Sequence, residues 1–395
     1  MALLLFDDPS WDNLLPLTFT RPAAELRIGI LTVAEKWKDE MGMPVSYLTR
    51  EHLSGKYPSH SGEDNLLING TLLPDGQVVS AIKSLKEESA LVKDGILLAV
   101  RTDKKGADSF RTDSWSGHLT LYPDEVGLVD FPWKVFSLNG KEIEADLKRI
   151  SRGRESETLS ETVKVIGPEN VFVEPGFKGE HFTLNASSGP VYLGRDSEIM
   201  EGSVIRGPFA LCEGSVVKMG AKIYGPTTIG PASKVGGEIN NSVIQANSNK
   251  AHDGFLGNAV IGEWCNLGAD TNNSNLKNNY SEVKIWNYPK RRFQKTGLQF
   301  CGLIMGDHSK CGINTMFNTG TVVGVSANIF GSGFPRNFIP SFSWGGAGGL
   351  STYRMDKVLE TTSLVMERRG IELSTEDRNI LQYIFDQTEG FRKWN

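Results

Sequence analysis

The sequence predicts an α/β domain followed by a prism of stacked parallel β-strands and then by helices. Three observations lead to this fold class. Short apolar runs alternate with helical patterns through roughly the first 150 residues. From residue 193 onward, apolar residues recur every six positions, a period that neither an α-helix nor an ordinary strand has. Near residue 350 this period has stopped and helical spacing returns.

The first domain is expected to cover residues 1–155. Pro22 suits the first turn of a helix, and the apolar residues after it lie near helical spacing, so we expect the first helix over residues 22–38. A parallel sheet with flanking helices would collect ligands at the carboxyl ends of its strands. A polar linker follows at 151–161. The apolar runs that predict strands are 2–6, 45–48, 65–68 and 96–100.

The six-residue period predicts the second domain, residues 163–345. Each unit is a short strand and a turn with one apolar side chain pointing inward, and three units close one coil. Coils then stack as parallel strands about 4.8 Å apart. A single coil cannot bury its own apolar corners, so the stack must be capped at its ends. The predicted inward positions are Leu193, Ile199, Ile205, Leu211, Val217, Ile223, Ile229 and Val235, and then Met305, Cys311, Phe317, Val323 and Ile329.

Residues 350–395 are expected to form a helical extension. Helical spacing resumes at about Tyr353. Ser374 and Asp377 stand as in a capping box, which predicts a last helix through Gln387. These helices would close the open end of the prism or pack along its side.

Composition narrows the class of protein. A net charge of −5 provides no basic stripe for a nucleic acid. The four cysteines all lie within the repeat region without zinc-type spacing, which is typical of buried thiols in a reducing cytosol. The apolar run at the N-terminus ends at Asp7 and is far too short for a signal peptide or a membrane span. We therefore expect a cytoplasmic protein with small-molecule substrates and neither a nucleic-acid nor a membrane partner.

Chemistry is expected where the six-residue period is interrupted. Two interruptions stand close together, the first at 249–262 with His252 and the second at 268–277, which leads into an inserted loop. A single histidine in a β-protein is more often a hydrogen-bonded surface residue than a catalyst. The neighbours of His252 therefore decide its interpretation.

These interruptions resemble the acetyltransferase half of the GlmU family, the bifunctional UDP-N-acetylglucosamine pyrophosphorylases and glucosamine-1-phosphate N-acetyltransferases. The family pattern His-x-x-aromatic-Leu-Gly is met at 252–257, and Asn-aliphatic-Gly-Ala-x-Thr at 266–271. The similarity runs through most of 165–345 and is greatest to a Bacteroidetes-type branch described as sugar nucleotidyltransferases. Hexapeptide proteins of this kind wind left-handed, so the resemblance implies a left-handed parallel β-helix.

The resemblance implies that His252 is the general base, because imidazole can take the proton that an amine loses as it attacks a thioester. Acetyl-CoA would be the acyl carrier, and Asn275 would orient the amino sugar or the acetyl group. Lys250, Phe255 and Lys284 would contribute to substrate binding. The relatives bind acyl-CoA between neighbouring chains, which implies a homotrimer.

Two departures from the family pattern affect the acceptor. Asn240 stands where relatives carry a lysine that holds the sugar phosphate, and Phe255 replaces a tyrosine. Phosphate affinity would then be weaker or supplied elsewhere, and one hydroxyl donor is missing. A different acceptor is compatible with both changes.

The first domain resembles the sugar-1-phosphate nucleotidyltransferase half of the same family. The resemblance implies nucleotide binding by Arg21, Asn69 and Gly70, although Arg21 would equally suit a salt bridge at a helix start. The family's glycine-rich loop, which cradles a triphosphate, is replaced by residues 9–14, and Thr71 stands in place of its magnesium-binding aspartate. If this site works, Mg²⁺ needs other carboxylates. The candidates are Asp7, Asp8 and Asp75, of which Asp7 and Asp8 would otherwise be solvated residues at a strand end.

Three classes of function follow. The first is a transferase. It would be an acetyl-CoA-dependent N-acetyltransferase that acts on an amino-sugar phosphate such as glucosamine-1-phosphate and is coupled to nucleotidyl transfer with a UDP-N-acetylglucosamine-type product. Alternatively, it would be an enzyme like a glucose-1-phosphate thymidylyltransferase. The second is a degenerate protein that binds or senses a sugar nucleotide. The third is a prism metalloenzyme of the γ-carbonic-anhydrase kind, for which His252 and His308 lack a closely spaced third histidine.

Overall fold

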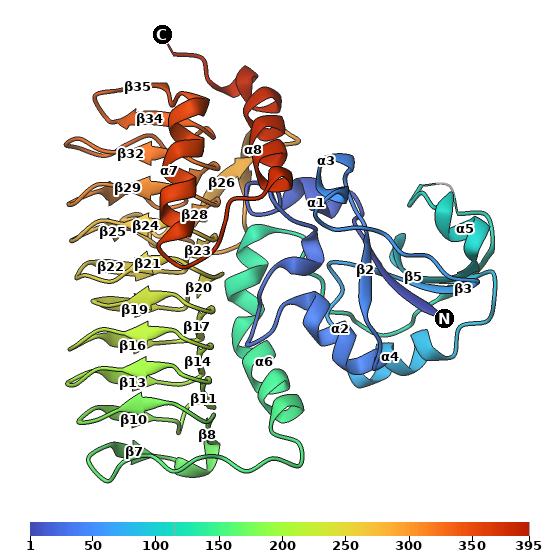
Figure 1. The fold of residues 1–395 in the computed structure, drawn as a ribbon, viewed down its shortest axis with the longest axis horizontal. Coiled ribbons are helices and arrows are strands. Elements are labelled where there is room, and N and C mark those ends of the chain that lie inside the picture. Colours follow the sequence, from blue (N-terminus) through green and yellow to red (C-terminus); the bar gives the residue numbers. More distant parts are fainter. Residues whose placement is uncertain (114, 395) are drawn as a thin grey trace. The chain divides into compact units, whose positions relative to one another are not determined.

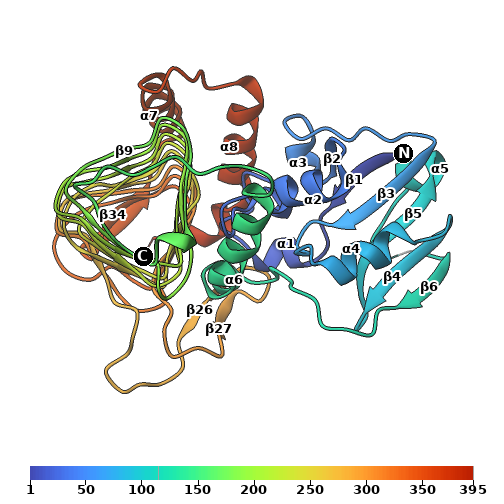
Figure 2. The same cartoon turned by 90° about the horizontal axis from the view of Figure 1, so that it is seen from below.

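The computed structural model describes residues 1–113 and 115–394, which divide into two compact units. The first, here called the sheet domain, comprises Met1–Leu14, Thr20–Leu26 and Leu31–Phe131. The second, called the prism domain, comprises Leu15–Phe19, Arg27–Ile30 and Pro132–Asn395. Figures 1 and 2 show the elements of both units.

The sheet domain contains one six-stranded sheet in the order β2-β1-β3-β5-β4-β6. All four predicted strands are confirmed. The expected parallel pairing is right for β1 with β2 and β3, but wrong for β5, which runs antiparallel to β3 and β4. The reason is the Asp94-Gly95 turn, where positive φ at both residues closes a hairpin between β4 and β5. The strands are β1 (Ala2–Phe6), β2 (Val45–Leu48), β3 (Asp64–Asn69), β4 (Ser89–Lys93), β5 (Ile96–Asp103) and β6 (His118–Leu121).

The single helix expected over 22–38 is wrong. Only a 3-10 turn η1 (Ala23–Glu25) and the helix α2 (Val33–Met41) form there, and Thr32 starts α2 through a capping box with Glu35. The stretch between them is extended, because Arg27 exchanges two backbone hydrogen bonds with the side chain of Gln245, at 2.7 and 3.1 Å. The remaining helices of the sheet domain are α1 (Ser10–Asn13), α3 (Glu51–Ser54), α4 (Gly76–Lys83) and α5 (Lys104–Asp108).

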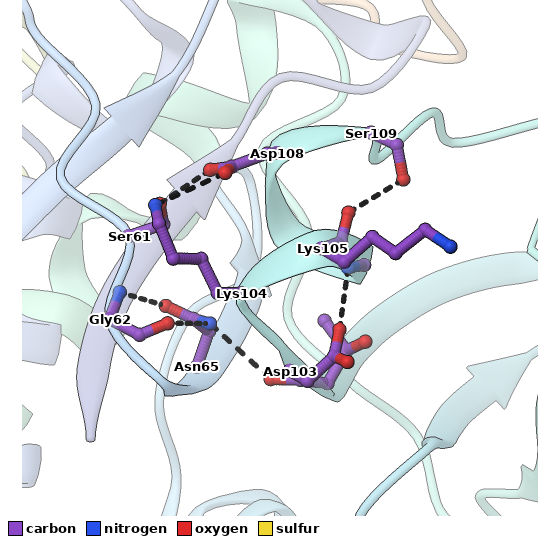
Figure 3. Close-up of polar contacts among 10 residues, drawn as sticks. Ser61, Gly62, Asn65, Asp103, Lys104, Lys105, Asp108 and Ser109 are labelled. Atoms are coloured by element: carbon purple, nitrogen blue, oxygen red, sulfur yellow. Dashed lines mark hydrogen bonds and ion pairs between the residues drawn. The ribbon is translucent and has the colours of Figure 1, made fainter.

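A polar cluster joins α5 to the loop before β3 (Figure 3). Asp103 caps α5 by accepting a hydrogen bond from the Gly106 N–H at 2.7 Å. Lys104 Nζ donates to Ser61 Oγ at 2.9 Å and pairs with Asp108 at 3.1 Å. Asn65 closes the loop on itself with two hydrogen bonds to Gly62, at 2.7 and 2.8 Å. These contacts hold the loop that leads into β3, and each of these polar groups has its partner within the sheet domain.

The prism domain is a parallel β-helix built from three sheets, as the six-residue period predicted, and it is left-handed, as the family resemblance implied. Every predicted inward residue is at most 5% exposed. The first face has β7 (Lys164–Ile166), β10 (Thr183–Asn185), β13 (Val204–Arg206), β16 (Lys222–Tyr224), β19 (Glu238–Asn240) and β22 (Phe255–Gly257). The second face has β8 (Val171–Val173), β11 (Val191–Leu193), β14 (Phe209–Leu211), β17 (Thr227–Ile229), β20 (Val243–Ile244), β23 (Val260–Ile261), β28 (Ile304–Met305), β31 (Val322–Val323) and β33 (Phe338–Ile339).

The third face has β9 (Lys178–Gly179), β12 (Glu198–Ile199), β15 (Val216–Val217), β18 (Lys234–Val235), β21 (Asn249–Lys250), β24 (Asn266–Leu267), β29 (Lys310–Cys311), β32 (Asn328–Ile329), β34 (Ser343–Gly346) and β35 (Gly349–Thr352). The pair β25 (Asn272–Asn273) and β30 (Met316–Phe317) continues the stack beyond β22. The inserted loop folds as an antiparallel hairpin, β26 (Lys284–Asn287) and β27 (Arg292–Lys295).

Helices cover two faces of the prism (Figures 1 and 2). The long helix α6 (Pro132–Ile150) packs on the second face, where Asn139 donates to the Pro226 carbonyl at 3.1 Å and accepts from Thr228 Oγ1 at 3.0 Å. Helices α7 (Met355–Glu367) and α8 (Thr375–Gln387) form the extension, and Ser374 caps α8 as predicted. Trp264, Met366 and Leu373 pack together and hold the extension to the third face. Within the described residues of this domain, no helix covers the first face.

Among the residues that the structure describes, no helix is long and apolar enough to cross a membrane. Short 3-10 turns, η2 (Pro168–Asn170) and η3 (Glu389–Phe391), complete the elements.

Candidate functional site

A lysine stands inside the prism beside the predicted catalytic histidine. The strand register aligns the inward positions of the third face across successive coils, and Lys250 lies between Val235 and Leu267 in that column. Lys250 is 2% exposed, and burial lowers its pKa to about 8. Its ammonium group donates to the carbonyl of His252 and, at 3.1 Å, to that of Asp253. The sequence-based expectation of a direct substrate contact by Lys250 is not supported by this inward placement.

His252 itself lies on the turn that leads from the third face to the first, and its side chain is exposed. Neither ring nitrogen has a hydrogen-bond partner among the described residues. The turn is also fixed from the next coil, where the Asp270 N–H donates to the Asp253 carbonyl at 3.1 Å. Two apolar residues on the same corner, Met219 and Ile313, are each 71% exposed. An unpaired imidazole thus stands on a firmly held corner that also carries exposed apolar surface.

Phe255 and Asn275 come together over Gly257 on the first face. A methyl group at Gly257 would lie 2.5 Å from Phe255 Cζ and 2.7 Å from Asn275 Nδ2, so only glycine leaves room for both. Asn275 Nδ2 donates to Asn258 Oδ1 at 2.8 Å. Its own Oδ1 accepts no hydrogen bond from the described residues and remains available to a ligand. The structure therefore brings together two of the predicted site residues.

An asparagine inside the prism supports this cluster. Asn273 is 3% exposed; its Oδ1 accepts from the Gly257 N–H at 2.8 Å and its Nδ2 donates to the Gly257 carbonyl at 2.9 Å. Sequence reasoning missed Asn273 and Asn258. Continuing the six-residue count from Leu267 would have placed Asn273 at an inward position, where a polar residue is a signal of function.

Of the two remaining predicted substrate-binding residues, Asn240 lies beside the Phe255 and Asn275 cluster and Lys284 lies on the inserted hairpin. Asn240 pairs in register with Gly257 in the neighbouring strand, and its carbonyl accepts from the Asn258 N–H at 3.0 Å. Asn240 is therefore next to the Phe255 and Asn275 cluster. Lys284 is exposed on the β26–β27 hairpin and makes no hydrogen bond with His252, Phe255 or Asn275 within the described residues.

Gly257→Ala is expected to separate Phe255 from Asn275 and to lower the acetyl transfer that the family resemblance implies by about 10- to 100-fold, because small misplacements of positioning groups are costly. Steady-state acetyl transfer provides the measurement. Gly312→Ala is the matched control: Gly312 also follows an inward residue, but its new methyl group would come no closer than 3.5 Å to Phe330. Equal activity of the two variants would contradict a role for this cluster.

Lys250→Met should leave the prism folded but lower the acetyl transfer that the family resemblance implies by about tenfold. Methionine fills the same space, and losing the buried charge offsets the loss of two hydrogen bonds. The turn that carries His252 then loses its internal anchor. Hydrogen exchange of residues 251–254 should become faster in the variant, and unchanged exchange and activity would show that the lysine does not hold this turn.

The sheet domain gathers its predicted residues at the carboxyl ends of β1 and β3. Asp8 accepts hydrogen bonds from the Ser10 N–H at 2.8 Å and from Asn69 Nδ2 at 2.9 Å. Asn69 Oδ1 in turn accepts from the Thr71 N–H at 2.9 Å and from its hydroxyl at 2.8 Å. The Gly70 N–H donates to the Phe6 carbonyl at 2.8 Å. These residues therefore hydrogen-bond to one another at the edge of the sheet where a ligand was expected.

Asp7 and Arg21 belong to the same edge. Asp7 accepts from the Ala23 N–H at 2.9 Å and from Thr49 Oγ1 at 2.5 Å, and burial raises the pKa of its carboxyl group to about 7. The Arg21 carbonyl accepts from the Trp11 indole at 3.1 Å, and Arg21 is only 5% exposed. Thr49 is a partner that the sequence did not indicate.

The Asp7 and Asp8 pair does not fit a magnesium ion as arranged. Mg²⁺ is held by ionised carboxylates and substrate phosphates. All four carboxylate oxygens already accept a hydrogen bond from the protein, and Asp7 is largely protonated below neutral pH. Over residues 1–113 and 115–394, no three His, Cys, Asp or Glu side chains gather as a metal site.

Comparisons with known proteins agree with this organisation. Residues 3–155 match the family model of sugar nucleotidyl transferases. The chain is 36% identical over 87 residues to the bifunctional protein GlmU of Methanocaldococcus jannaschii, covering 22% of this chain and 21% of that protein. It is 32% identical over 144 residues to the bifunctional sugar-1-phosphate nucleotidylyltransferase/acetyltransferase of Sulfurisphaera tokodaii, covering 36% and 35%. The chain thus spans about a fifth to a third of the length of these relatives.

Among solved structures, the chain is similar to the UDP-N-acetylglucosamine acyltransferase of Arabidopsis, with 16% identity and a TM-score of 0.26, over 60% of this chain and 99% of that one. The relatives are transferases by name. Residues 3–155 therefore match the sugar nucleotidyl transferase family model, and the chain continues from there into a left-handed β-helix.

Proposed function

We propose that the prism domain transfers an acetyl group from acetyl-CoA to the amine of an amino-sugar phosphate such as glucosamine-1-phosphate. One observation carries the proposal: the imidazole of His252 is exposed and unpaired among the described residues, on a turn that a buried lysine fixes from inside the prism. A general base needs access to its proton and a fixed position. The exposed imidazole and the anchored backbone of its turn support this role.

In this proposal each of four residues has one role. His252 takes the proton from the attacking amine, and Lys250 holds the backbone that carries it. The free Oδ1 of Asn275 accepts a hydrogen bond from the amino sugar, while Phe255 provides an apolar surface beside it. Acetyl-CoA, when bound, supplies the acetyl group as a thioester.

The acceptor site of this proposal includes Asn240. An asparagine can donate hydrogen bonds to a sugar phosphate but does not neutralise its charge. The phosphate would therefore be held weakly at this position, or by a cation from elsewhere, for which Lys284 on the β26–β27 hairpin is the candidate.

We further propose that the protein is a homotrimer with this site between neighbouring prisms. The first face carries exposed apolar side chains, including Val204 at 49%, Tyr224 at 36% and Met316 at 36%. Parts of the other two faces are covered by helices of their own domain. Exposed apolar side chains on an otherwise uncovered face are compatible with an interface. Light scattering should give three times the mass of one chain; a monomer at high concentration would contradict the proposal.

The acetyl transfer is tested with purified protein, acetyl-CoA and glucosamine-1-phosphate, by following release of the CoA thiol. Glucose-1-phosphate, which has no amine, is the matched control acceptor. We expect release of the CoA thiol with glucosamine-1-phosphate and none with glucose-1-phosphate. Release that is equal with both sugars would indicate hydrolysis of the thioester, and no release with a panel of amino-sugar phosphates would contradict the proposal.

For residues 3–155 we infer binding of a sugar nucleotide without magnesium-dependent nucleotidyl transfer. The family match supports the ligand class. The raised pKa of the Asp7 carboxyl group and Thr71 in place of the family's magnesium-binding aspartate argue against a metal there. The protein is incubated with sugar-1-phosphates, UTP or dTTP, and Mg²⁺, and pyrophosphate is measured. We expect none. Release with UTP would instead support a coupled UDP-N-acetylglucosamine-type product, and release with dTTP a thymidylyltransferase.

A further inference from the structure

The third face of the prism and the last turn of α7 enclose a polar cavity of about 550 Å³. Four of the side chains that line it are cationic, namely Lys234, Lys310, Arg368 and Arg369, and none is acidic. Such a volume is in the range of small-molecule sites. The excess of positive charge is unusual for a chain whose net charge is −5.

The cavity floor is a ladder of polar side chains on four successive coils. The strand register places Lys234 beside Asn249, Asn249 beside Asn266, and Asn266 beside Lys310. Because neighbouring strands lie about 4.8 Å apart, the two lysines stand at the ends of a row with two amides between them. Trp264 contributes an aromatic wall and is stacked on His308 with ring centroids 6.3 Å apart.

None of the four cations forms an ion pair within the described residues. Arg369 donates to the Ala232 carbonyl and, at 3.2 Å, to Asn249 Oδ1, while Lys310 donates to the His308 carbonyl at 2.9 Å. Burial lowers the pKa of Lys310, and burial together with the neighbouring Arg368 charge lowers the pKa of Arg369. Lys310 and Arg369 are thus held by hydrogen bonds to the protein. The side chains of Lys234 and Arg368 make no hydrogen bond or ion pair with the described residues.

The helix end explains part of this arrangement. Cations are favourable at the C-terminal end of a helix such as α7, so the two arginines alone would be unremarkable. That argument does not account for Lys234 and Lys310, which come from strands of the opposite wall. Lys310 and Arg369 are partly buried, and holding these two cations in one cavity without an ion pair costs free energy that a bound anion would offset.

We propose that this cavity binds a small phosphorylated molecule that carries at least two phosphate charges, such as a nucleoside diphosphate or another organic diphosphate. Arginine forks and lysine ammonium groups recognise phosphate oxygens, the asparagine amides donate further hydrogen bonds, and Trp264 contacts an apolar or ring portion. The site is formed by one chain alone, and it does not depend on the acetyl transfer proposed above.

The test is isothermal titration of the full chain with inorganic pyrophosphate at low ionic strength and without Mg²⁺. We expect binding in the parent and at least tenfold weaker binding in the double variant Lys234→Gln, Arg368→Gln. Lys357→Gln is the matched control, because Lys357 lies on the same helix but pairs with Glu360 at 2.7 Å. It should bind as the parent does.

Parallel titrations with UDP and with coenzyme A identify the source of the phosphates, since the natural ligand should bind more tightly than pyrophosphate and lose affinity in the same double variant. Unchanged thermal unfolding shows that the variants fold. Absence of binding by all three probes, or equal affinity in the parent and the double variant, would overturn the proposal. The titrations do not measure acetyl transfer, so the cavity proposal can fail while the acetyl-transfer proposal holds, and the reverse.

Discussion

Replacing His252 by asparagine is expected to lower kcat for acetyl transfer by about 10²- to 10⁴-fold, the usual contribution of a general base. The side chain is exposed, so its removal costs little stability. Asparagine keeps a polar group on the turn but cannot take a proton near neutral pH. The CoA-thiol assay with glucosamine-1-phosphate measures the loss, and circular dichroism and light scattering check that fold and assembly are retained.

The prism itself provides a matched control. His181 is exposed on an equivalent turn between the third and first faces, several coils earlier, and its backbone has positive φ, which asparagine tolerates. His181→Asn should leave kcat unchanged. If both variants keep full activity, His252 is not the base; if both lose it equally, the effect belongs to the corner of the prism and not to the imidazole.

The prism was predictable because its signal is periodic. One inward side chain every six residues leaves few alternatives, and each predicted position, from Leu193 to Ile329, is buried. The strands of the sheet domain were found for a similar reason, since β1 is a continuous apolar run and β3 contains the apolar run 66–68. Local pattern was sufficient wherever burial alone decided the structure.

The helix expected over 22–38 failed because distant partners decide its conformation. Its spacing was helical, yet Gly29 donates to Asn139 Oδ1 at 2.8 Å and Ile30 donates to Asp146 Oδ2 at 2.8 Å. Both partners lie more than 100 residues away in sequence. Only the three-dimensional structure shows that these bonds replace those of a helix.

The candidate site was only partly predictable. The sequence singled out His252, Phe255 and Asn275, but it could not show that Lys250 points into the prism. A count by six from Val235 does not reach Lys250, because the coil between these two residues is shorter than three six-residue units; it turns early, at Gly236 and Gly237. The strand register nevertheless pairs Lys250 with Val235. A charged residue at an inward position became visible only through the strand register.

The second large effect is a pH dependence that originates at Asp7. The pKa of this carboxyl group is about 7 in the folded protein and 3.8 ordinarily, and burial is the main cause. Between these values the unfolded chain is ionised while the folded one keeps its proton, so stability falls as pH rises and levels off above about pH 7. The shift corresponds to at most about 4 kcal/mol. Asp7→Asn should therefore match the parent near pH 4 and exceed it by about 2–4 kcal/mol at pH 8.

Hydrogen exchange of β1 and β3, compared between variant and parent at the same pH, measures this difference within the sheet domain. Asp94→Asn is the control, since Asp94 is exposed on a hairpin turn with positive φ and should show no such change. Repeating the measurement with Mg²⁺ tests the metal question directly. Protection that increases with Mg²⁺ in the parent at pH 8, and not in Asp7→Asn, would show that the carboxylate gives up its proton to bind metal. Protection that is insensitive to Mg²⁺ is expected, because burial favours the protonated form of the Asp7 carboxyl group and a metal would first have to displace that proton.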